Sequence, residues 1–223
     1  MWHEGRLHRG DARLLRARGP GYDTGEILGR AEGIRLGFRL TIGTDDVAAM
    51  IADHNHRMRA VGTITCKEFG PAALSTDGQF ELFAPAQRGR YSMRYRLPFR
   101  AWDGQPMTLL GYKDVGDDHG PDMWPDTTTC YTRLCHGSAD WPTDPGEPDG
   151  SDIAGPLPRG TTPLVEPGEP DEHARGILRL TAPMFARQLA TFRGTPEGLA
   201  RFGVFFGQGL LRAYRGPFRR YSV

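Results

Sequence analysis

The stretch Arg90–Phe99, RYSMRYRLPF, decides the fold class of this 223-residue chain. Every second residue from Tyr91 to Phe99 is aromatic or apolar, whereas Arg90, Ser92, Arg94 and Arg96 alternate with them. A period of two is typical of a β-strand that has one buried and one solvated face. The segment therefore predicts a half-buried strand with an aromatic side and a basic side.

Further segments of this kind lie on both sides of that strand. Short intervals and turn signals such as Asp77-Gly78 and Asp103-Gly104 favour antiparallel meander connections between them. We therefore expect a mainly β fold, either an antiparallel β-barrel or a strongly curled sheet of the calycin-like kind. The additional strands are predicted at residues 34–42, 58–66, 78–84, 106–115, 127–136 and 174–181.

Helices are predicted in two parts of the chain. Thr44-Asp45-Asp46 supplies N-cap chemistry for a short helix over 47–52. Two C-terminal helices are predicted over 182–192 and 195–214, and the second has an apolar stripe. That second helix contains three glycines, Gly203, Gly207 and Gly209. They predict that the helix packs closely against the sheet.

The chain divides into four regions by composition. Residues 1–33, rich in Arg and Gly, are predicted to form an N-terminal arm on the surface, and residues 34–137 the β-barrel core. Residues 138–173 contain eight prolines and carry a net charge of −8, so they are predicted to be an acidic linker or lid. Residues 174–223 are predicted to supply the last barrel strand and the C-terminal helices.

The overall composition excludes several classes of function. The formal net charge is +1, so no strong field favours a nucleic-acid partner. We find no signal-peptide pattern and no run of 18 apolar residues, hence no membrane span is expected. The three cysteines match no disulfide framework, which favours a cytoplasmic protein.

Lys113 is the most informative candidate for chemistry. The chain has 28 basic residues, yet only Lys67 and Lys113 are lysine, and Lys113 lies on the predicted strand 106–115. A buried amine shifts its pKa readily and can act as an acid, a base or a nucleophile. The alternative is an ion pair that fixes the following loop, and its partner would be Asp117, Asp118 or Asp126.

The aromatic strand face provides a candidate cavity wall. Lys113, Tyr95 and Tyr131 are the candidate catalytic residues, because an amine and phenol hydroxyls can orient a carbonyl or stabilise an enolate. The alternative is a solid barrel core with no cavity. The candidate substrate-binding residues are Phe38, Phe80, Tyr91, Met93, Leu97 and Trp124.

No metal or redox cofactor is expected. The chain has neither an HExxH motif nor a pair of zinc-type cysteines, and its aspartates at 117–126 match no EF-hand loop. The nearest run to a dinucleotide fingerprint, residues 19–25, has the wrong spacing, and the hydrolase motif GxSxG is absent. FAD binding is therefore not predicted.

Several blocks of sequence carry a family resemblance. GYKDVGDD at 111–118 and DMWPDTTT at 122–129 are the central blocks, with Arg94–Leu97 upstream and segments 176–180 and 185–193 downstream. Together they resemble a region of actinobacterial proteins that join a GMC (cholesterol-oxidase-like) flavin oxidoreductase to an α/β-hydrolase domain. The resemblance covers about residues 34–137 and 174–214. It implies an apolar, polyketide- or sterol-like substrate and a place in secondary metabolism.

Two functional hypotheses follow. The first is a cofactor-independent isomerase or cyclase that encloses an apolar polyketide- or sterol-like substrate in its barrel. The second is a non-catalytic module that binds a hydrophobic ligand or serves a separate GMC-type flavin oxidoreductase. The sequence leaves two questions open, namely whether the protein is an enzyme and whether it forms a homodimer.

Overall fold

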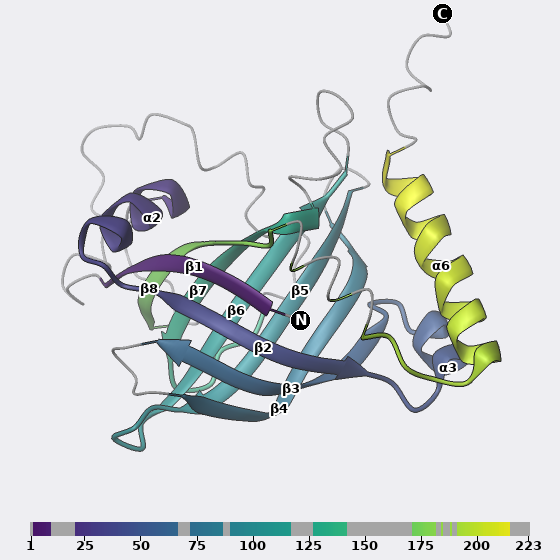
Figure 1. Ribbon diagram of the computed structural model, residues 1–223, viewed down its shortest axis with the longest axis horizontal. Helices are drawn as coiled ribbons and strands as arrows, with labels where there is room; N and C mark the ends of the chain where they lie inside the picture. The colour runs from purple at the N-terminus through teal and green to yellow at the C-terminus, as the bar shows by residue number, and fades with distance from the viewer. Residues whose placement is uncertain are drawn as a thin grey trace, which may run out of the picture.

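The sheet closes into a barrel in the computed structural model (Figure 1). The structure describes residues 2–9, 21–66, 72–86, 90–116, 127–141, 171–181 and 191–214, with Met184 and Gln188; for residues 2–9 it describes the backbone. Each strand pairs antiparallel with the next along the chain, and the last pairs with the first. The predicted fold class is therefore confirmed.

The elements of the described residues are these. The strands are β1 (Trp2–Arg9), β2 (Leu36–Gly43), β3 (Arg57–Cys66), β4 (Ala73–Pro85), β5 (Tyr91–Arg100), β6 (Pro106–Val115), β7 (Thr129–His136) and β8 (Glu172–Arg179). The helices are α2 (Tyr22–Ala31), α3 (Val47–Ala52) and α6 (Pro196–Tyr214). Strand β8 begins two residues inside the region predicted as a linker.

Strand β5 has the faces that its sequence predicts. Tyr95 and Leu97 are fully buried, Phe99 is 5% exposed, and Arg94 and Arg96, which alternate with them, are partly exposed. The register pairs Tyr95 with Gly111 and Met93 with Lys113, so the inward residues of β5 and β6 share the barrel interior. The core lies inside the closed sheet.

The N-terminal arm is a correction, because residues 2–9 form strand β1. Gly5 pairs with Leu36 of β2 on one side and with Leu178 of β8 on the other. The segment closes the barrel and is not an arm on its surface. The sequence pattern missed this strand because its few apolar residues give no clear alternation.

Helix α2 is a second correction, because it lies within residues 1–33, which were predicted to be a surface arm. Gly25 and Gly29 are buried where α2 packs on β1 and β8. A Cβ atom at Gly25 would lie 2.4 Å from the carbonyl oxygen of Arg175. The glycine therefore allows the helix backbone to approach the barrel closely.

Helix α3 begins as predicted. The Asp46 carboxylate accepts hydrogen bonds from the backbone N–H groups of Ala48 and Ala49, at 2.7 and 3.0 Å. Helix α6 also matches its predicted range and lies beside α3 (Figure 1). The predicted helix over 182–192 falls mostly outside the described residues.

The glycines of α6 differ from the prediction in part. An added Cβ at Gly209 would lie 2.3 Å from the Phe83 ring, so this residue does pack closely against the barrel. Gly203 and Gly207 face open space, with no atom within 4 Å of such a Cβ. The prediction was wrong for these two because they lie on the outer side of the helix.

Two further predictions concern the linker or lid at residues 138–173 and the absence of a membrane-spanning helix. Residues 142–170 of the predicted linker or lid lie outside the described residues, so that prediction stands untested. Among the helices that the structure describes, none is long and apolar enough to cross a membrane.

Removal of residues 2–9 tests the closure of the barrel. Truncation leaves β2 and β8 with unpaired edges, so we expect a lower thermal midpoint and faster amide exchange in those two strands. Amides shared by β4 and β5, which keep both neighbours, serve as the internal control. An unchanged midpoint and unchanged exchange in β8 would contradict the closure.

Gly62→Ala tests the packing at the β3 bulge. An added Cβ at Gly62 would lie 1.9 Å from the carbonyl oxygen of Arg39, so we expect the free energy of unfolding to fall by roughly 1–3 kcal/mol. Gly43→Ala is the matched control, because an added Cβ there has no atom within 4 Å. Urea denaturation measures both, and equal stability of the two variants would contradict the described backbone.

Candidate functional site

Lys113 points into the barrel from β6. It is 2% exposed, and its ammonium nitrogen Nζ donates a hydrogen bond to the carbonyl oxygen of Thr127 at 3.0 Å. The same nitrogen lies 5.8 Å from the centre of the Tyr95 ring, within the range of a cation–π contact. The alternating burial of β6 places Lys113 inward with Leu109, Gly111 and Val115.

Burial dominates the electrostatics of Lys113. Loss of solvent lowers the pKa of its amine from 10.5 to about 8, and the Cys130 thiol opposes the shift only in part. No carboxylate of the described residues pairs with Nζ. The predicted partners Asp117, Asp118 and Asp126 lie outside the described residues, so that alternative stays a prediction.

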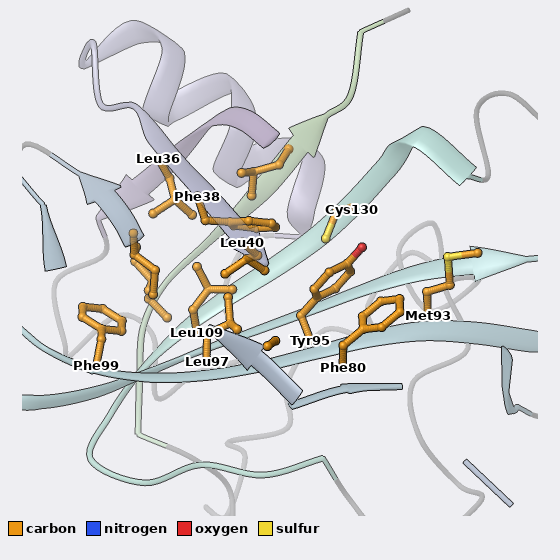
Figure 2. Close-up of a cluster of buried hydrophobic side chains, with 14 of the residues drawn as sticks. Leu36, Phe38, Leu40, Phe80, Met93, Tyr95, Leu97, Phe99, Leu109 and Cys130 are labelled. Carbon is orange, nitrogen blue, oxygen red and sulfur yellow. The ribbon is translucent and has the colours of Figure 1, made fainter. Parts of the chain in front are cut away.

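Tyr95 forms the centre of the interior. Its ring is fully buried and packs against the rings of Phe80 and Phe38, at centroid distances of 4.8 and 5.6 Å. Burial raises the pKa of its hydroxyl well above 10. Figure 2 shows the hydroxyl on the side of the ring that faces Cys130. The phenol is therefore a neutral hydrogen-bonding group inside the barrel.

Cys130 is the site residue that sequence reasoning missed. The antiparallel register of β6 and β7 pairs Gly111 with Thr132. Two residues further along both strands, the same register places Cys130 opposite Lys113. The cysteine is fully buried, and burial raises the pKa of its thiol to about 12. The alternation of Cys130, Thr132 and Leu134 along the predicted strand was the signal that could have found it.

Tyr131 is a correction, because it lies on the outer face of the barrel. Its ring stacks on Tyr112 at 5.2 Å and meets the edge of Tyr22 of α2 at 5.3 Å. Inward residues of β7 alternate with it, so Tyr131 is separated from Lys113 and Tyr95 by the sheet. Tyr131 was predicted to point inward because it is aromatic, like the inward residues of β5, whereas the inward residues of β7 are Cys130, Thr132 and Leu134.

The predicted substrate wall is largely brought together. Phe38, Phe80, Met93 and Leu97 belong to the same buried cluster as Tyr95 (Figure 2). Tyr91 is half-buried at the edge of the cluster, where its ring lies 6.4 Å from that of Phe83. Trp124 lies outside the described residues.

Helix α6 contacts the interior near this end of the barrel. Phe83 packs against Phe205 and Phe206, with ring centroids 6.2 and 5.5 Å away, and His56 lies 4.8 Å from Phe205. His56 and Phe83 both have positive φ angles, 49° and 52°, which non-glycine residues seldom adopt. Both strained residues are thus held against α6.

Comparisons with known proteins identify no family. No family model, no curated protein and no solved structure matches the chain. The resemblance to the region beside GMC-type oxidoreductases therefore stays a prediction. Within the described residues, no group of three or more His, Cys, Asp or Glu side chains is placed to hold a metal ion.

Lys113→Met tests the burial of the amine. Below pH 8 the lysine is protonated in both folded and unfolded states, and burying the ammonium costs the folded state on the order of 3 kcal/mol. Between pH 8 and 10.5 the unfolded state binds the proton more strongly, so wild-type stability rises with pH. We expect the free energy of unfolding of the wild type, measured by urea denaturation, to rise relative to that of the variant across that interval.

The contradicting outcome is a constant difference. If the free energies of unfolding of wild type and Lys113→Met stay parallel from pH 7 to about 10.5, the amine does not titrate differently in the folded protein.

Proposed function

We propose that the barrel interior binds an apolar polyketide- or sterol-like carbonyl compound and isomerises or cyclises it without a redox cofactor. One observation carries this proposal, namely the Lys113 amine buried among aromatic and apolar side chains. Its hydrogen bond goes to a backbone carbonyl, and no described carboxylate neutralises it. A buried amine of this kind is costly for stability, and functional sites are where such costs are found.

The pKa of Lys113 suits proton transfer near neutral pH. With a pKa of about 8, both the ammonium and the amine are populated under ordinary conditions. The ammonium donates a hydrogen bond to a carbonyl or enolate oxygen, and the amine accepts a proton from the adjacent carbon. Shifting the proton from one carbon to another moves a double bond and leaves the enzyme unchanged.

Tyr95 supplies a second donor for the same oxygen. Its hydroxyl stays neutral because burial raises its pKa, so it donates a hydrogen bond without developing charge. The Cys130 thiol, with a pKa of about 12, is also neutral and is not a nucleophile at neutral pH. The reaction therefore relies on Lys113 and Tyr95.

The aromatic wall holds the substrate. Phe38, Phe80 and Met93 surround the tyrosine ring and offer apolar surface to a hydrophobic chain or ring system. Enclosing a flexible substrate between these side chains and α6 favours one reactive conformation. Entry at this end requires α6 to move away from Phe83.

Two variants and a matched control test the proposal. Purified protein is incubated with a panel of apolar ketones, from steroid enones to linear poly-β-ketones, and binding and conversion are followed by mass spectrometry. We expect Lys113→Met and Tyr95→Phe to lose turnover by at least tenfold while retaining affinity. Tyr131→Phe is the control, because that tyrosine lies outside the barrel and should leave both properties unchanged.

The outcomes separate the candidate functions. Binding without turnover in the wild type would indicate a carrier, or an accessory module for a separate flavin oxidoreductase. Absence of binding by every ketone, together with a fully packed interior, would contradict both functions. Equal loss of turnover in Tyr131→Phe would contradict the assignment of the site to the interior.

A further inference from the structure

An open hollow of about 500 Å³ lies on the outside of the barrel. Its floor includes Gly43, Arg59, Gln79 and Arg96, which the strand register places side by side across β2, β3, β4 and β5. These residues alternate with inward ones, so they face away from Lys113 and the core. Gly43 leaves the space open, because a Cβ there has no atom within 4 Å.

The row of residues next to the hollow has a carboxylate between its two arginines. This row crosses β3, β4 and β5 in the same register, and it consists of Arg57, Glu81 and Arg94. There Glu81 lies between two arginines, 3.9 Å from Arg94, and supplies the negative charge that they need. In the row at the hollow, the neutral Gln79 occupies the position between Arg59 and Arg96.

Each of the two arginines has a carboxylate partner among the described residues. Arg59 lies 3.9 Å from Asp45, and both side chains are mostly exposed, so this contact contributes little. Arg96 is one-fifth exposed, and it contacts the carbonyl oxygen of Ala139 at 2.9 Å, the Ser138 hydroxyl at 3.3 Å and the Asp140 carboxylate at 3.4 Å. These contacts hold the guanidinium of Arg96 in a fixed orientation.

We propose that this hollow binds the tetrahedral oxyanion group of a small molecule, a phosphate or sulfate ester, between Arg59 and Arg96. Guanidinium groups bind such oxygens with two parallel hydrogen bonds. The lining also includes Arg57, which lies 3.3 Å from the Asp53 carboxylate, and the carboxylates of Asp45 and Asp77. Its volume is that of a small-molecule site.

Calorimetry on the full chain tests the proposal with inorganic pyrophosphate and inorganic sulfate as separate probes. We expect saturable binding of at least one of them. Preference for pyrophosphate assigns the site to phosphate esters, and equal or tighter sulfate binding assigns it to sulfate esters. Arg59→Gln removes one charge-assisted contact and should weaken binding at least about tenfold.

Two further variants address the geometry. Gln79→Glu places a carboxylate between the arginines, as in the neighbouring row, and should abolish binding at nearly constant shape. Gly43→Leu fills the hollow without changing charge and should abolish binding as well. The matched control is Arg35→Gln, which removes an exposed arginine next to the start of β2, at its opposite end from Gly43, and should leave the affinity within about twofold.

Three results would overturn the proposal. They are the absence of saturable binding by either probe at physiological salt, full affinity in Gln79→Glu and Gly43→Leu, and an equal loss in Arg35→Gln. The last would indicate general attraction to positive charge rather than a site. None of these variants touches Lys113 or Tyr95, so the result is independent of the function proposed for the interior.

Discussion

The pairing of β1 with both β2 and β8 is the constraint on which the rest of the structure depends. An open sheet would leave two strand edges exposed and would let water reach its concave face. Closure removes both edges and turns that face into an interior in which Tyr95 and Leu97 are fully buried. The same closure desolvates Lys113, so the chemistry proposed for the protein follows from the topology of its sheet.

Burial of Lys113 costs stability that the surrounding interior must offset. The aromatic side chains around it supply apolar contact, and among the described residues the ammonium donates one hydrogen bond, to the carbonyl oxygen of Thr127. A methionine of similar volume would fill the same space at no electrostatic cost. The amine there, in a chain whose 28 basic residues include only two lysines, is the observation on which the proposed function of the interior rests.

Most of the correct predictions rest on local patterns, but the turn predicted at Asp77-Gly78 was wrong, because both residues lie inside β4. Other predictions failed where information from distant segments was needed. The faces of β5, the cap of α3 and the range of α6 follow from period and capping chemistry alone. Strand β1 and helix α2 have weak patterns, and their partners in the barrel specify their structure. Tyr131 was assigned to the interior because it is aromatic, although the alternation of Cys130, Thr132 and Leu134 places it on the other face of β7. The contrast between Gln79 and Glu81 becomes visible only once the register is known.

The most direct test of a desolvated amine inside the barrel is the titration of its own side chain. The chain contains two lysines, so a sample labelled with ¹³C-lysine gives two side-chain signals, and Lys113→Met identifies the one from the interior. We predict that this signal titrates with a midpoint at about pH 8. A midpoint at or above 10.5, the value of an unperturbed lysine, would contradict it.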